Sequence, residues 1–156
     1  MKHRTTDELL AKVPLFEGLT NKQLREVSNL ATRMNLAAGR ELTKQGATGK
    51  EFLIVLDGSV DVLIDGVVVA SPAPGECYGE VALLADRPRT ATVVATSDVT
   101  VDIIGRLEFY DMLERQPQIA ARLQEAMAAH LAADAAEAER RASAPGSTSP
   151  TAEPGR

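Results

Sequence analysis

The pattern of apolar and polar residues divides the chain into a helical start, a β-type centre and a helical end. From about Thr32 to Gly105, apolar residues recur with a period of two, and turn residues interrupt the pattern every few positions. Such alternation is typical of half-buried strands, and many short strands with regular turns predict a sandwich, jelly roll or barrel. We expect strands at residues 32–36, 41–44, 51–56, 59–64, 67–70, 76–78, 91–95 and 99–104.

Two features of the strand pattern bear on pairing and burial. Asp57-Gly58 and Asp65-Gly66 each lie between apolar runs. Asp-Gly favours the two-residue type I′ turn, whose central positions both need positive φ, so each pair predicts a β-hairpin between its flanking strands. In the last strand Val99, Val101 and Ile103 alternate with Thr100 and Asp102. This alternation predicts one buried face.

The N-terminal segment, residues 1–31, has the signals of two helices. Thr5 and Glu8 have the spacing of a capping box before an apolar run, which predicts a short helix that ends before Pro14. Thr20 and Gln23 repeat that spacing at the start of a second, more amphipathic helix. We therefore expect a helical lead-in before the first strand.

The helical pattern returns in residues 106–141. A short helix with apolar residues at positions 107–113 is expected to end near Gln116-Pro117. A long Ala-rich helix then runs from Pro117, a residue suited to the first helical position, to about Arg141. An apolar stripe recurs along it at Ile119, Leu123, Met127 and Leu131. We expect this helix either to pair weakly with its copy in a homodimer or to fold over a ligand as a lid. Residues 142–156 have the composition of a disordered tail.

Composition and charge exclude several classes of protein. A length of 156 residues suits one domain, and a net charge of −5 argues against a general nucleic-acid partner. Apolar runs are too short to span a bilayer, and no signal peptide begins the chain. Cys77 is the only cysteine, which fits a reducing, cytoplasmic compartment, and we interpret it as a small buried hydrophobe.

An enzyme is not expected. The only histidines, His3 and His130, lie outside the predicted strands, so the chain lacks the cluster that a metal site in such a fold would need. No Gly-x-Ser-x-Gly, P-loop or Cys/His pair predicts covalent or phosphoryl chemistry. We expect neither a metal nor a catalytic residue.

One stretch carries candidate binding chemistry. Gly79 permits a sharp turn, and residues 80–84 then have the composition of one helical turn. The N–H groups at a helix start attract anions, and Arg89 follows with a planar fork that suits phosphate oxygens. Pro88 restricts the backbone before Arg89 and helps to aim it.

This ordered set resembles the phosphate-binding cassette of the cyclic nucleotide-binding domain family, the domain found in catabolite activators and protein kinase A regulatory subunits. The matching residues are Gly79-Glu80, the apolar turn at 81–84 and Pro88-Arg89-Thr90-Ala91. Residues 13–19 also resemble the family's helical lead-in. The resemblance implies a mainly β fold, a β-roll of about eight strands, with helices at both ends.

The resemblance also implies a ligand site, made of Gly79, Glu80, Val81, Ala82, Arg89, Thr90 and Ala91. Arg89 would bind the phosphate, Glu80 would accept a hydrogen bond from the ribose 2′-hydroxyl, and Ala91 would offer its backbone N–H. The favoured ligand is cAMP, with cGMP as the alternative. Simpler interpretations stay open: Arg89 pairs with Asp86 or Glu80 at the surface, Glu80 caps the short helix, and Thr90 begins the next strand.

We therefore interpret the chain as a stand-alone sensor with a lead-in (1–31), a β-roll (32–105) that holds the cassette (78–92), C-terminal helices (106–141) and a tail (142–156). The family resemblance implies that ligand draws the cassette inward and that the C-terminal helices re-dock as a lid. The output would be an unidentified effector protein or self-association. The alternative is a β-roll scaffold that binds proteins without a nucleotide.

Overall fold

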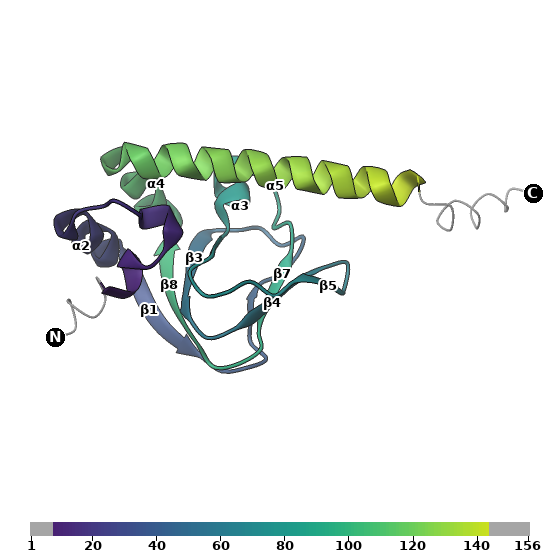
Figure 1. Ribbon diagram of the computed structural model, residues 1–156, viewed down its shortest axis with the longest axis horizontal. Helices are drawn as coiled ribbons and strands as arrows, with labels where there is room; N and C mark the ends of the chain where they lie inside the picture. The colour runs from purple at the N-terminus through teal and green to yellow at the C-terminus, as the bar shows by residue number, and fades with distance from the viewer. Residues whose placement is uncertain (1–7, 144–156) are drawn as a thin grey trace, which may run out of the picture. The chain divides into compact units, whose positions relative to one another are not determined.

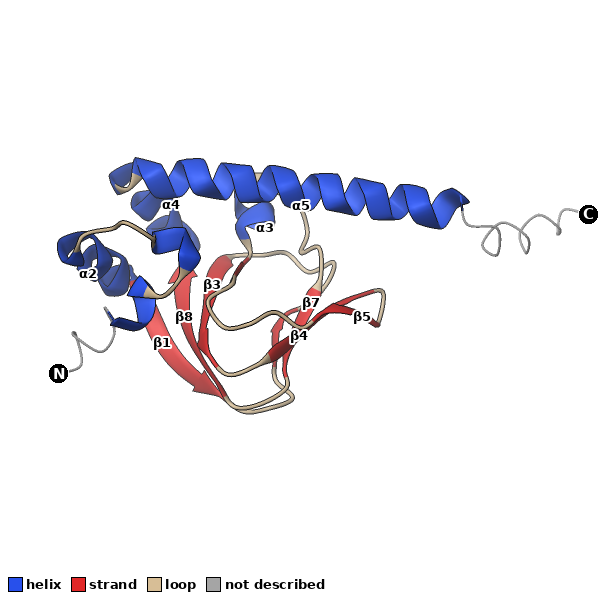
Figure 2. Ribbon diagram, viewed as in Figure 1, coloured by secondary structure: helices blue, strands red, loops and turns tan. Residues whose placement is uncertain are grey.

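The computed structural model describes residues 8–143. Its described strands form two antiparallel four-stranded sheets, in the orders β1-β8-β3-β6 and β2-β7-β4-β5 (Figures 1 and 2). The strands are β1 Ala31–Leu36, β2 Glu41–Thr43, β3 Glu51–Asp57, β4 Val60–Ile64, β5 Val67–Ala70, β6 Cys77–Tyr78, β7 Thr92–Ala95 and β8 Val99–Gly105. The expected β-roll is confirmed, and each strand lies within two residues of its predicted limits.

The two Asp-Gly pairs behave differently. Asp65 and Gly66 have φ values of 54° and 80° and join β4 to β5, so that hairpin is confirmed. The hairpin predicted at Asp57-Gly58 is wrong, because β3 and β4 belong to different sheets. Gly58 has a φ of 92°, and a Cβ there would overlap the carbonyl oxygen of Asp98. This glycine therefore marks the place where the chain changes sheets.

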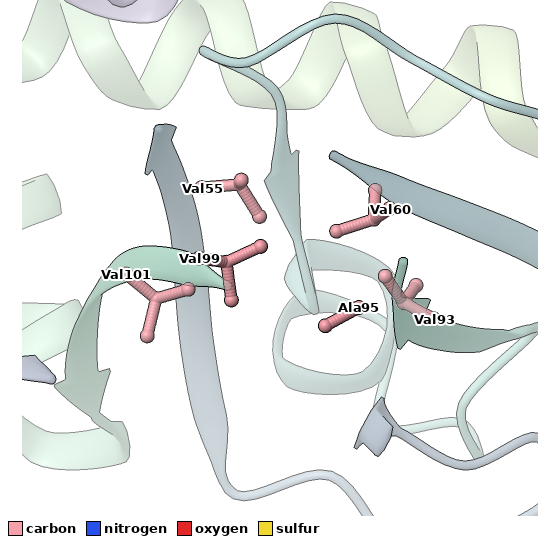
Figure 3. Close-up of a cluster of buried hydrophobic side chains, with 6 residues drawn as sticks. All are labelled: Val55, Val60, Val93, Ala95, Val99 and Val101. Carbon is pink, nitrogen blue, oxygen red and sulfur yellow. The ribbon is translucent and has the colours of Figure 1, made fainter. Parts of the chain in front are cut away.

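A cluster of small aliphatic side chains fills part of the roll. Figure 3 shows its members, which come from both sheets: Val55, Val60, Val93, Ala95, Val99 and Val101. Tyr78 packs against this cluster from β6, at the start of the cassette. The β-branched valines are stiff at χ1, and their tight packing gives the cassette a rigid base.

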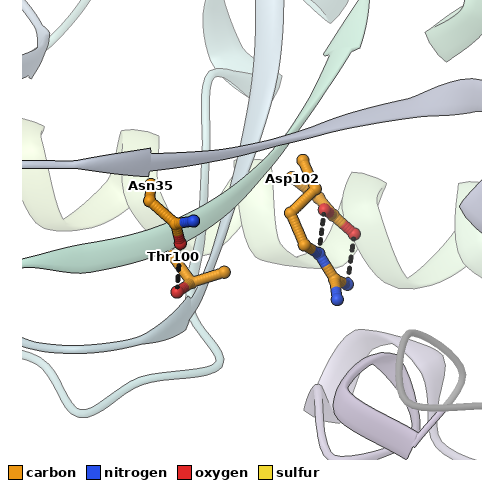
Figure 4. Close-up of polar contacts among 4 residues, drawn as sticks. Asn35, Thr100 and Asp102 are labelled. Atoms are coloured by element: carbon orange, nitrogen blue, oxygen red, sulfur yellow. Dashed lines mark hydrogen bonds and ion pairs between the residues drawn. The ribbon is translucent and has the colours of Figure 1, made fainter. Parts of the chain in front are cut away.

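The other face of β8 is also covered, in contrast to the single buried face that the alternation predicts. Asp102 is 1% exposed, and its carboxylate accepts two hydrogen bonds from Arg33 on β1, at 2.9 and 3.1 Å. Figure 4 shows this pair beside a second contact, in which the Thr100 hydroxyl donates to the Asn35 side chain at 2.9 Å. The register places Arg33 directly opposite Asp102.

The predicted helical lead-in is present. Residues 8–11 are helical, while Thr5 lies outside the described residues. A 3₁₀ turn, η1 (Pro14–Phe16), leads to α2 (Asn21–Leu30), whose capping box between Thr20 and Gln23 is complete. The apolar face of α2 is buried in the same compact unit as the roll.

The C-terminal helices follow β8 directly. Helix α4 (Arg106–Arg115) packs on β3 and β8, and the ring of Phe109 lies 4.9 Å from that of Phe52. Helix α5 (Pro117–Ser143) begins at the expected proline. The chain divides into two compact units, Met1–Ala121 and Arg122–Arg156, so the first turn of α5 belongs to the unit of the roll.

Most of the predicted tail lies outside the described residues. None of the helices within 8–143 has the length and apolarity of a membrane span.

Candidate nucleotide site

The cassette is built on a glycine that no other residue could replace. Helix α3 (Glu80–Leu84) has the predicted limits, and its N-cap Gly79 has φ 109° and ψ −6°. A Cβ on Gly79 would lie 2.5 Å from Nη1 of Arg89 and 2.6 Å from the carbonyl oxygen of Glu51. The position therefore needs both the left-handed backbone and the empty space of glycine.

Arg89 is half-buried against this turn. Its Nη2 donates to the carbonyl oxygen of Glu51 at 3.0 Å, and its backbone is held by hydrogen bonds with Gly46 and Ala47. Its Nη1 is buried and has no hydrogen-bond partner among the described residues. Burial lowers the pKa of the guanidinium, while Glu51 and Glu80 oppose that shift. The site thus holds a partly desolvated guanidinium, and its Nη1 can still donate a hydrogen bond.

Gly49 is a site residue that the sequence analysis does not identify. Its φ is not positive, yet a Cβ there would lie 2.6 Å from Cβ of Ala82 and 2.7 Å from Nε of Arg89. The requirement is space rather than backbone freedom. The loop before β3 therefore packs directly against α3 and Arg89. The only sequence signal of this contact is a second glycine, Gly49, three residues after Gly46.

The remaining predicted site residues lie on the same short stretch. Glu80, Val81 and Ala82 are all buried in the first turn of α3, with Glu80 only 3% exposed. Thr90 is exposed and Ala91 half-buried. Thr90 does not begin the next strand, as one interpretation had it, because β7 starts at Thr92.

The two residues before Gly79, Cys77 and Tyr78, both have raised pKa values. Burial, helped by Glu80 and Glu76, raises the pKa of the Cys77 thiol well above its usual value. A protonated thiol is a poor nucleophile, but the residue as a whole is half-buried, not fully buried as its sequence-based interpretation had it. Burial also raises the pKa of Tyr78, whose hydroxyl has no hydrogen-bond partner among the described residues.

A hydrogen bond links the cassette to the helix after the roll. The Tyr110 hydroxyl on α4 donates to the carbonyl oxygen of Leu83 at 2.9 Å. Leu83 lies in the last turn of α3, where carbonyl groups lack intrahelical partners. A displacement of α3 would therefore strain or break this contact with α4.

These features fit a small monoanion better than a metal. The residues that meet at the cassette are a guanidinium, a glycine turn and the start of α3, all of which favour negative charge. No group of three potential metal-ligating side chains occurs among the described residues. The buried carboxylate of Glu80 offers hydrogen-bond acceptors beside the anion position.

The match to known families agrees with this geometry. Residues 33–116 match the cyclic nucleotide-binding domain. The matched segment includes most of β1, all of β2 to β8, and the helices α3 and α4. The chain belongs to the cyclic nucleotide-binding domain family.

Individual relatives fall into the two groups that the sequence resembles. The cAMP-dependent protein kinase regulatory subunit of Eremothecium gossypii is 34% identical over 108 residues, which are 69% of this chain and 24% of that protein. The catabolite activator protein of Thermus thermophilus has a similar structure, with a TM-score of 0.70 and 27% identity over 81% of this chain and 62% of that one. This chain spans about a quarter of the length of the curated relatives it matches.

A third relative limits what the fold implies. The regulatory subunit of a cAMP-independent protein kinase A from Trypanosoma brucei has a TM-score of 0.72 and 24% identity, over 80% of this chain and 45% of that one. This likeness concerns the fold alone. Since proteins with this fold differ in their dependence on cAMP, a ligand has to be argued from the cassette itself.

Proposed function

We propose that this chain is a non-catalytic regulatory module that binds a 3′,5′-cyclic nucleotide, with cAMP as the preferred ligand. The observation that carries the proposal is the buried Nη1 of Arg89, a charge-bearing donor with no partner among the described residues. Leaving such a donor unpaired is costly, and an equatorial phosphate oxygen would satisfy it. The names of the kinase regulatory relatives support cAMP as that ligand.

Each predicted site residue has a role in the proposal. Arg89 binds the phosphate from one side, and the N–H groups of Glu80, Val81 and Ala82 approach it from the first turn of α3. Gly79 lets the phosphate come close, since it has no side chain. Ala91 offers its backbone N–H. Thr90, being exposed, is available to contact the base or phosphate.

The expected response to ligand follows from differential affinity. A nucleotide changes the arrangement of cassette and helices only as far as it binds one arrangement better than the other. The hydrogen bond between Tyr110 and Leu83 links α4 to the cassette. A movement of α3 toward a bound phosphate would therefore either pull α4 along or break this hydrogen bond. The output proposed is an effector protein or self-association, with α5 acting as a lid or a weak homodimer contact.

Calorimetric titration tests the function directly. We expect saturable binding of cAMP with one site per chain, and weaker binding of cGMP in competition. AMP, which lacks the cyclic phosphodiester and carries a second charge, should bind far more weakly. Absence of binding to any cyclic nucleotide would favour the alternative, a scaffold that acts without a nucleotide. A preference for cGMP that is lost in Thr90→Ala would overturn the choice of cAMP.

Glu80 is expected to select ribose over deoxyribose. Its carboxylate is buried, and a hydrogen bond from the 2′-hydroxyl to a charged acceptor is worth about 1.5–3 kcal/mol. Wild type should therefore bind cAMP about 10- to 150-fold more tightly than 2′-deoxy-cAMP. Glu80→Gln removes the charge at nearly constant shape and should reduce this ratio. An unchanged ratio in a variant with wild-type thermal unfolding would show that Glu80 does not bind the 2′-hydroxyl.

A further inference from the structure

Strand β5 has three consecutive exposed valines and an unpaired outer edge. β5 ends the sheet β2-β7-β4-β5, and no described strand pairs with its outer side. All four of its residues are exposed, and Val67, Val68 and Val69 are 61%, 50% and 49% exposed. Proteins usually protect such an edge with lysine or proline within the strand, and β5 has neither.

The register of the β4–β5 hairpin determines which backbone groups face outward. Ile64 and Val67 flank the two-residue turn, so they form the hydrogen-bonded pair that closes it. Hydrogen-bonded and non-hydrogen-bonded pairs alternate in an antiparallel ladder. The next pair, Leu63 and Val68, is therefore non-hydrogen-bonded, and the N–H and C=O of Val68 point away from β4.

We infer that β5 is an interface for a second copy of this chain, through antiparallel pairing of the two β5 strands about a two-fold axis at Val68. In that register Val68 exchanges both backbone hydrogen bonds with its own copy. An unpaired strand edge can bind another extended strand through its backbone N–H and C=O groups. With a two-fold axis at Val68, the outward N–H and C=O groups of one β5 face the C=O and N–H groups of the other. The interface lies on β5, apart from the nucleotide cassette.

Charge and side-chain identity favour a second copy as the occupant. The two-fold register places Val67 opposite Val69, Gly66 opposite Ala70 and Asp65 opposite Ser71 of the copy. No two like charges face each other, and valine meets valine across the axis, a favourable cross-strand combination. A strand with a lysine or aspartate at its centre would be repelled by its own copy.

The expected dimer is weak. The register of β4 and β5 shifts between Val62 and Leu63, which places a bulge at Val69 and shortens the regular part of the edge. Pro72 and Pro74 follow β5 and cannot donate to an extended ladder. Self-association should therefore depend on protein concentration and be visible only near the upper end of the accessible range.

Sedimentation equilibrium of four proteins tests the proposal. Wild type and Val68→Thr, which keeps a β-branched side chain without charge, should dimerise as concentration rises. Val68→Lys places two like charges on the axis and should stay monomeric with unchanged thermal unfolding. Leu131→Glu perturbs the stripe of α5 and should still dimerise. A wild type that is monomeric throughout, or loss of dimer in Leu131→Glu but not in Val68→Lys, would overturn the β5 interface.

A cysteine substitution tests the register itself. Residues in a hydrogen-bonded antiparallel pair have Cα atoms about 5.5 Å apart, within the range that a disulfide spans. On mild oxidation, Val68→Cys should form a disulfide that joins the two copies at position 68, identified by peptide mapping. Val67→Cys faces Val69 of the copy rather than itself and should link far less, and wild type, which has only Cys77, should not link. Equal linkage of the two variants would contradict a two-fold axis at Val68.

Discussion

Arg89→Ala is expected to weaken cAMP binding by about 30- to 5,000-fold, the range that corresponds to a loss of about 2–5 kcal/mol when one member of a buried charged pair is removed. The fold should be retained. Within residues 8–143 the side chain gives one hydrogen bond, from Nη2 to the Glu51 carbonyl oxygen, while hydrogen bonds with Gly46 and Ala47 involve its backbone alone.

Two further variants make the result specific. Arg89→Lys keeps the charge but loses the fork that presents Nη1 and Nη2 together, so it should bind almost as poorly as Arg89→Ala. Arg87→Ala changes the net charge equally at an exposed position two residues away and should bind nearly as wild type does. Calorimetry on the three variants is the measurement. Equal affinity in Arg89→Ala and Arg87→Ala would remove Arg89 from the site.

The cassette was the most predictable part of the fold because its determinants are local. A glycine turn, an apolar helical turn and Pro88 specify the backbone of α3 and its approach to Arg89 within a few residues. The limits of α3 and the capping box of α2 were predicted to the residue for the same reason. The roles of the individual site residues stay predictions.

The Asp-Gly dipeptide itself could not predict the change of sheets at Gly58. Asp57-Gly58 and Asp65-Gly66 are the same dipeptide between apolar runs, yet only the second closes a hairpin. The difference lies in β3, where residues 52–56 are buried on both faces. An uninterrupted apolar run of this kind indicates a strand that is covered on both sides, and the run in residues 52–56 carries that signal.

Gly49 shows a second limit of sequence reasoning. Its lack of a side chain is required by Ala82 and Arg89, which lie far away along the chain. Contacts of that kind depend on the closed roll, and a single sequence shows only that a glycine is present. The same holds for Asp102, which alternation placed opposite the buried face although Arg33 and the surrounding elements cover it.

The ion pair between Arg33 and Asp102 is expected to dominate the polar contribution to stability. Asp102 is buried, so removing the guanidinium would leave its carboxylate without the two hydrogen bonds at 2.9 and 3.1 Å. Stranding one member of a buried pair typically costs about 3–5 kcal/mol. Arg33→Ala should therefore lower the free energy of unfolding by about 3 kcal/mol, at the lower end because the Arg33 side chain is 27% exposed.

Urea denaturation with a matched control measures this effect. Arg115 and Asp111 form an exposed pair one helical turn apart, with side chains 59% and 38% exposed, so Arg115→Ala should lower the free energy of unfolding far less than Arg33→Ala does. Replacing both members of the buried pair, as Arg33→Met with Asp102→Leu, removes the stranded charge and should recover most of the lost stability. If Arg33→Ala costs no more than Arg115→Ala, water must reach Asp102 in solution, and the pair then fixes the register of β1 on β8 rather than the stability of the roll.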